Sequence, residues 1–213
     1  METLKRITVD FDKKHHWNNI YETKDTRSVS WYQNIPEISL NFLEIYNLPK
    51  DAKIIDVGGG DSLFVDHLLN LGFSNITVLD ISRSALKKAK DRLGDRSDKI
   101  TWIESDILKF SPTVKYDFWH DRATFHFLFE EKEIELYKKI STEAISDNGI
   151  MVIGAFSKVG SKSCSGLKVK QQTEHSLPAT FRNNFYKLDC IVSDHLTPKG
   201  TVQNFIYCSL QKI

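Results

Sequence analysis

The sequence predicts an α/β fold built on a doubly wound, mostly parallel sheet with helices on both faces. Short β-branched runs alternate with helical patterns over roughly 100 residues from residue 53 onward. The last two predicted strands are joined by residues 197–201, a linker short enough for an antiparallel hairpin. The chain has 213 residues, of which 40% are apolar, and this suits one domain with a real core.

The elements of the parallel part follow from β-branched runs, helix caps and glycine stops. Predicted strands cover residues 53–57, 75–80, 100–103, 116–119 and 150–154. Predicted helices run from Asp61 or Ser62 to Gly72, from Ser82 to Gly94, and from about 130 to 146, where Asn148 and Gly149 stop the last one. Right-handed crossovers between parallel strands place these helices on both faces of the sheet.

The two ends of the chain differ from this repeating part. A polar loop is predicted over residues 157–173 and a short helix over 178–185. The strands 186–196 and 202–210 then close the sheet and place an antiparallel strand at its edge. Residues 1–50 are predicted to form a helical cap segment across the top of the sheet, and residues 51–213 form the main domain.

Composition narrows the classes of function. The 29 Lys and Arg residues nearly balance the 28 Asp and Glu residues, which argues against a nucleic-acid partner. The three cysteines have neither zinc-site nor CxxC spacing, so no metal is expected. They do not suggest a disulfide framework either. No apolar leader and no run long enough to cross a membrane is visible, which predicts a cytoplasmic protein in a reducing compartment.

The turn after the first strand, Gly58-Gly59-Gly60, suits a bound ligand. Glycines let the backbone approach a ligand because no Cβ stands in the way. A dinucleotide fingerprint would need a third glycine where Leu63 stands, so that class is excluded. Asp56, inside the strand, would repel a pyrophosphate and favours a ligand with positive charge.

Two further carboxylates follow the next strands. Asp80, at the end of the second strand, can accept both hydroxyls of a ribose. Asp106, beside the apolar Ile107, can accept an adenine amino proton while the ring packs on the aliphatic chain. One acidic group at each strand end matches a nucleoside with a cationic tail and no phosphate.

These motifs resemble those of class I S-adenosylmethionine-dependent methyltransferases. Residues 54–60 resemble the first motif, 78–82 the second, 105–107 the third and 116–122 the fourth, and the similarity extends from about Lys53 to the C-terminus. The resemblance implies strand order 3-2-1-4-5-7-6 with the last strand antiparallel, and S-adenosylmethionine as the cofactor. It makes 51–213 the cofactor-binding domain. Ser62 stands where the family often has a third glycine, a departure that a helix cap tolerates.

The resemblance also assigns residues to the cofactor. Gly58 and Gly60 would pass the methionine part, Asp80 would bind the ribose, and Asp106 with Ile107 would bind the adenine. The complete predicted cofactor set is Asp56, Gly58, Gly59, Gly60, Asp80, Ile81, Asp106, Ile107, His120, Trp17 and Tyr32.

The acceptor is expected over the ends of the fourth and fifth strands, where His120, Asp121 and Arg122 are the predicted catalytic residues. The run 120–127 resembles both thiopurine-type S-methyltransferases and lysine methyltransferases that act on elongation factor. Each residue also has a structural alternative: Asp121 and Arg122 as an ion pair or cap, and His126 as a core histidine. His120 is equally compatible with contacting the cofactor.

The remaining candidates are aromatic or basic. Trp17, Tyr21, Trp31 and Tyr32 either roof the methionine end of the cofactor, through cation–π attraction to the sulfonium, or only pack the N-terminal helices. Cys164 lies in the polar loop, where a thiol is usually incidental. Lysines at 158, 162, 168 and 170 either form a solvated loop or a lid that attracts an anionic acceptor.

The sequence therefore predicts a methyltransferase that acts on the O, S or N atom of a small molecule. The alternative is a protein lysine N-methyltransferase, which would need an open groove with an acidic rim. A third hypothesis is a cofactor-binding partner subunit that has lost catalysis. No nucleic-acid or membrane partner is expected.

Overall fold

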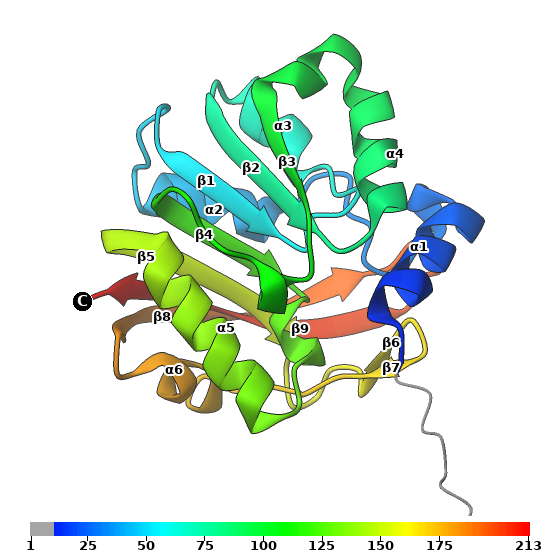
Figure 1. Cartoon of the computed structure of the whole chain (residues 1–213). Coiled ribbons are helices and arrows are strands. Elements are labelled where there is room, and N and C mark those ends of the chain that lie inside the picture. The colour runs from blue at the N-terminus through cyan, green and yellow to red at the C-terminus, as the bar shows by residue number, and fades with distance from the viewer. Residues whose placement is uncertain (1–10) are drawn as a thin grey trace, which may run out of the picture.

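The protein, described over residues 11–213 by a computed structural model, is organised around a seven-stranded sheet (Figure 1). The strands are β1 Lys53–Val57, β2 Asn75–Asp80, β3 Ile100–Glu104, β4 Tyr116–Arg122, β5 Ile145–Phe156, β8 Phe185–Leu196 and β9 Val202–Lys212. Their order is β3-β2-β1-β4-β5-β9-β8, with β1 to β5 parallel and β9 antiparallel to both neighbours. This confirms the predicted order. The antiparallel strand, however, is internal, and the edge predicted for it belongs to β8.

Helices cover both faces, as predicted. They are α1 Lys13–Thr23, α2 Glu37–Ile45, α3 Phe64–Asn70, α4 Arg83–Leu93, α5 Glu131–Ala144 and α6 Ser176–Phe181. Alternation along β1 divides the core: Ile54 packs with α2, α3 and α4, whereas Ile55 and Val57 pack with α5 and α6. β1 is buried from Ile54 to Val57, and three of its five residues are apolar, as a strand covered on both faces requires.

The register brings the ends of the central strands to one edge. Asp56 is paired with Val78 on β2 and with His120 on β4, and Asp80 is paired with Glu104 on β3. In parallel sheets, ligands bind outside these carboxyl ends. The residues singled out by sequence therefore lie on neighbouring strands at a common level.

The junction after α5 differs from the prediction. The helix ends at Ala144 and β5 begins at once with Ile145, so Asn148 and Gly149 lie inside a strand and do not stop the helix. Asn148 has a φ of 63°, and the β4–β5 register shifts between Tyr116 and Phe118. The polar pair therefore forms an irregularity in the strand, of the kind that a bulge requires.

Two features near the C-terminus also differ. Cys190 and Cys208, opposite each other on β8 and β9, form a disulfide, whereas no disulfide was expected. The hairpin register explains the pairing, because it places residues 18 apart in sequence directly across from each other. The predicted loop 157–173 contains a small hairpin, β6 Ser163–Cys164 and β7 Leu167–Lys168.

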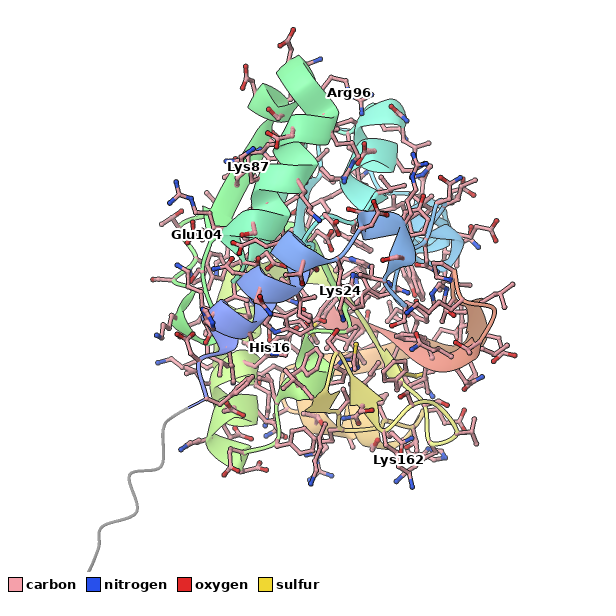
Figure 2. The ribbon with its side chains drawn as sticks, turned by 90° about the vertical axis from the view of Figure 1, so that its right-hand side faces the viewer. His16, Lys24, Lys87, Arg96, Glu104 and Lys162 are labelled. Carbon is pink, nitrogen blue, oxygen red and sulfur yellow. A yellow bond between two sulfur atoms is a disulfide. The ribbon has the colours of Figure 1, made fainter. Side chains whose placement is uncertain are left out.

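The N-terminal helices lie against the main sheet domain. Asn18 on α1 accepts hydrogen bonds through Oδ1 from Ser82 Oγ (2.9 Å) and Ser84 N (3.2 Å) at the start of α4. Figure 2 looks onto α1, between the labelled His16 and Lys24, with α4 above it and the β6–β7 hairpin below. Residues 1–10 of the predicted cap lie outside the described residues. No helix of residues 11–213 is long and apolar enough to cross a membrane.

Candidate active site

A cavity opens at the carboxyl ends of β1 to β4 and runs beneath α1 and the β6–β7 hairpin. Ten of the residues predicted from sequence line it: Trp17, Asp56, Gly58, Gly59, Asp80, Ile81, Asp106, Ile107, His120 and Arg122. The lining also includes residues that sequence reasoning did not select, among them Ser39, Phe64, Thr124 and Phe127. Gly60, Asp121 and Tyr32 do not line it.

The glycine turn forms the floor. The amides of Gly58 and Gly59 donate to the carbonyl of Leu79 at 2.7 and 3.2 Å, which holds the turn against β2. Gly58 has a φ of 66°, and a Cβ there would overlap Thr124. Gly60 has a φ of 53°, and its Cβ would stand 2.5 Å from Tyr21 Oη. At both positions glycine is required for two reasons: the positive φ and the lack of space for a Cβ.

Asp80 is a buried carboxyl with spare acceptor capacity. Its Oδ1 accepts from the amide of Ser82 at 2.7 Å. Burial raises the pKa of Asp80 to about 7, against the Ser82 hydrogen bond, and the nearby Asp56 and Asp61 raise it further. A ligand that brings hydroxyl donors to this carboxylate would relieve its desolvation.

Asp106 and Ile107 lie beyond β3, at the far end of the cavity. Asp106 caps the 3-10 helix Ile107–Lys109 by accepting from Leu108 N at 2.9 Å. Ile107 is buried in the core below. A carboxylate beside an aliphatic surface is the arrangement predicted for an adenine, and the structure brings both residues to the cavity wall.

His120 sits at the centre of a buried network. Its Nδ1 lies 2.7 Å from Asp56 Oδ1, and its Nε2 lies 2.8 Å from Ser39 Oγ. Phe64 packs against the imidazole with ring centroids 4.4 Å apart. Both ring nitrogens are thus engaged, and the network joins α2 to the ends of β1 and β4. Ser39 was missed because no local motif marks it.

Asp121 points away from the cavity. Its carboxylate accepts from Tyr137 Oη at 2.6 Å, from Thr124 N at 2.8 Å and from Phe125 N at 3.1 Å. Burial raises its pKa to about 6, although these three hydrogen bonds oppose the shift. The structure therefore places Asp121, a predicted catalytic residue, as the anchor of the turn after β4.

Arg122 points the other way, into the cavity wall. Nε donates to Tyr207 Oη at 3.0 Å, and Nη1 donates to the carbonyl of Trp31 at 2.9 Å. No acidic side chain among residues 11–213 forms an ion pair with it. The ion pair with Asp121 that sequence adjacency allowed is therefore absent from the described structure.

Aromatic rings cover the cavity. The Trp17 ring centroid lies 5.3 Å from that of Phe127 and 6.1 Å from that of Trp31, and Tyr21 packs beside both tryptophans. Tyr32, by contrast, lies outside the lining with its hydroxyl 3.4 Å from Asn34 Oδ1. Three of the four predicted aromatic residues, Trp17, Tyr21 and Trp31, therefore cover the cavity.

In the loop after β5, the four lysines follow the alternative of a solvated loop and not that of a lid over the cavity. Cys164 lines the cavity, and burial raises the pKa of its thiol. The four lysines of the loop are exposed and absent from the lining, and Figure 2 shows Lys162 at the periphery. His126 is buried among Phe127 and Phe156, and burial lowers its pKa to about 3, as a neutral core histidine requires.

Comparison with known proteins finds similarity to methyltransferases. Residues 55–151 match a family described as a methyltransferase domain. Curated relatives include mouse "EEF1A lysine methyltransferase 2", 35% identical over 53% of this chain and 50% of its own length. Another is "Malonyl-[acyl-carrier protein] O-methyltransferase 2" of Ilyobacter polytropus, 36% identical over 37% of this chain and 30% of its own length. The chain thus spans half or less of these two relatives.

Solved structures share the whole fold. A methyltransferase of Anabaena variabilis superposes with a TM-score of 0.73 at 14% identity, covering 96% of both chains. The N-methyltransferase NodS of Bradyrhizobium japonicum, in complex with S-adenosyl-L-homocysteine, gives 0.69 at 13% identity, covering 94% of this chain and 99% of NodS. The strand order is that of the class I S-adenosylmethionine-dependent methyltransferases, and residues 55–151 carry the match to a methyltransferase domain.

Proposed function

We propose that this protein transfers the methyl group of S-adenosylmethionine to an O, S or N atom of a small molecule. The observation that carries the proposal is that one covered cavity is lined both by the strand-end residues and by the N-terminal aromatic residues. Its floor holds the glycine turn and the strand-end carboxylates, and its roof is built from the aromatic side chains of α1 and the following turn. A covered, aromatic cavity suits a compact acceptor better than an extended protein surface.

The described residues fit the cofactor. Gly58 and Gly59 line the cavity with backbone alone, so no side chain of these two residues stands between the turn and the methionine part. Asp80 has acceptor capacity for the ribose, and Asp106 with Ile107 suits the adenine. When bound, the cofactor supplies an electrophilic methyl group on a sulfonium, and the protein supplies alignment and exclusion of water.

His120 serves this chemistry as a positioning residue. Since Asp56 Oδ1 and Ser39 Oγ lie within hydrogen-bond distance of its two ring nitrogens, the ring is held in place, and an acceptor would have to displace Ser39 to reach Nε2 directly. Its network instead fixes the floor beneath the glycine turn and ties α2 to it. This favours an acceptor whose nucleophile needs no strong base, such as an ionised thiol or a free amine.

We propose that residues 11–50 act as the cap of the site, because their aromatic side chains Trp17, Tyr21 and Trp31 cover the cavity.

The competing function is methylation of a protein lysine, as the name of the mouse relative, "EEF1A lysine methyltransferase 2", suggests. The described wall on the β4 side offers Arg122 rather than an acidic rim, which disfavours a lysine side chain. A cytoplasmic location and the absence of a nucleic-acid partner stay predictions from composition.

Calorimetry followed by label transfer tests the proposal. We expect S-adenosylhomocysteine to bind below millimolar concentration, and tritium from methyl-labelled S-adenosylmethionine to enter the small-molecule fraction of a cell extract. Asp80→Ala is the matched control, because it removes the ribose acceptor while leaving the β4 side intact. Absence of binding would contradict the cofactor assignment, and label only in the protein fraction would favour the lysine alternative.

A further inference from the structure

Arg122 ends β4 with a guanidinium that the protein only partly satisfies. Two of its nitrogens donate to Tyr207 and to the Trp31 carbonyl, and its central carbon lies 5.1 Å from the Phe205 ring centroid. The third nitrogen, Nη2, is buried and has no hydrogen-bond partner. A buried donor left unpaired costs free energy, the more so on a charged group.

The groups packed around Arg122 do not neutralise it. They come from three elements: His126 after β4, Cys164 on β6 and His195 on β8. The charge of Arg122 helps to lower the pKa values of His126 and His195, after burial as the larger cause, so both histidines favour the neutral form. Burial raises the pKa of the Cys164 thiol, which favours its neutral form as well. A positive charge therefore faces the cavity without a counter-ion from the described residues.

The position of Arg122 separates it from the cofactor contacts. It is paired with Gly154 on β5, and its partner Tyr207 and stacking neighbour Phe205 belong to β9. Asp80 ends β2 and Asp106 follows β3, and both strands lie on the other side of β1 in the sheet order. The unpaired cation thus lies on the half of the cavity that remains for the acceptor.

We propose that the acceptor carries a carboxylate that Arg122 binds through Nη2, and that this carboxylate is not the atom that is methylated. The inference rests on the proposed function and names its substrate class. Arginine presents a planar fork that matches a carboxylate, and the contacts at Nε and Nη1 hold that fork in place. The acceptor is therefore a small anionic acid with a separate nucleophile.

The carboxylate must be separate from the nucleophile for a catalytic reason. A nucleophile becomes less negative, as a thiolate does, or more positive, as an amine does, when it bonds to the methyl carbon. Pairing it with Arg122 would stabilise the reactant more than the transition state and would slow transfer. A carboxylate elsewhere on the acceptor keeps its charge throughout, so Arg122 can anchor the molecule at no cost to the chemical step.

The test compares Arg122→Gln and Arg122→Lys with Arg182→Gln, a matched change of an exposed arginine after α6. Each protein is incubated with methyl-tritiated S-adenosylmethionine and a protein-free cell extract, and the labelled product is passed over an anion exchanger. We expect the wild-type product to be retained, and Arg122→Gln to lower transfer by about 10-fold or more, the scale of a hydrogen bond to a charged group. Arg122→Lys should retain part of the rate and Arg182→Gln all of it.

Calorimetry in the same variants separates the acceptor from the cofactor as the source of the carboxylate. Binding of S-adenosylhomocysteine is compared with that of 5′-methylthioadenosine, which lacks the amino-acid part. We expect both affinities to stay near wild type, which also shows that the variants fold. Loss of the first affinity alone would assign Arg122 to the cofactor carboxylate and overturn the proposal, as would a labelled product that passes through the exchanger. Cofactor binding with no label in any fraction would instead refute the proposed function itself.

Discussion

The two halves of the cavity differ in how far apart in the chain the residues that hold their charged side chains lie. On the cofactor half, carboxylates at the ends of β2 and β3 are held by amides only two residues further along the chain, as in Asp80 with Ser82 and Asp106 with Leu108. On the acceptor half, Arg122 is held by Trp31 and Tyr207, 91 and 85 residues away. The first half therefore rests on local segments, and the second half exists only once the chain has folded.

The largest effect is expected at the turn after β4, which joins the two halves of the cavity. Asp121 receives three hydrogen bonds that fix residues 124 and 125 and the buried Tyr137 hydroxyl. Asp121→Ala leaves these donors without a partner, and we expect the free energy of unfolding to fall by about 3 kcal/mol or more. Urea unfolding measures the loss. Asp121→Asn keeps an acceptor of the same shape and should cost less; equal loss in both variants would contradict the network as the cause.

Next in size is the effect of Asp80→Ala on the cofactor half alone. Removing a charged acceptor of ribose hydroxyls should weaken S-adenosylhomocysteine by about 1.5–3 kcal/mol in calorimetry. Because the acceptor half shares no direct contact with Asp80, the Arg122→Gln change should leave this affinity unaltered. An unchanged affinity in Asp80→Ala would mean that the ribose lies elsewhere.

The raised pKa of Asp80 makes the same contact sensitive to pH. Its pKa is about 7 in the free protein because the carboxyl is buried. Hydroxyl donors favour the charged form, so binding lowers the pKa and releases a proton. Affinity for S-adenosylhomocysteine should therefore rise as pH increases from 5 to 7 and level off above the free-state pKa, by up to about 10-fold per pH unit. Calorimetry in buffers of different ionisation enthalpy counts the proton, and Asp80→Asn should abolish its release.

The same contrast explains what sequence could predict. Asp56, Asp80 and Asp106 follow from short motifs in which β-branched runs, glycines and strand-end carboxylates are neighbours in the chain, and the strand order follows from the family that these motifs resemble. Ser39, which completes the His120 network, lies 81 residues from its partner and has no such neighbours. Its contribution depends on how α2 docks, which no local pattern encodes.

Adjacent residues illustrate the limit most directly. Asp121 and Arg122 suggested one ion pair or one catalytic pair, but side chains of consecutive strand residues point to opposite faces. Asp121 therefore joins the buried network with Tyr137, whereas Arg122 reaches the cavity. The lysines of the 157–173 loop follow the solvated alternative for a related reason, because the β6–β7 hairpin turns Cys164 toward the cavity and leaves the lysines exposed.

The smallest expected effect is that of Trp17→Leu, and it decides whether Trp17 attracts the sulfonium or only packs α1. If Trp17 attracts the sulfonium by a cation–π interaction, Trp17→Leu should weaken S-adenosylmethionine by about 0.5–1 kcal/mol and leave the neutral thioether of S-adenosylhomocysteine unaffected. If the ring only packs α1 against Trp31 and Phe127, both ligands should weaken together. The two ligands differ at the sulfur by one methyl group and one charge, so their affinity ratio isolates the electrostatic part from any loosening of α1. A ratio unchanged by the substitution would assign Trp17 to packing and leave the sulfonium to the floor of the cavity.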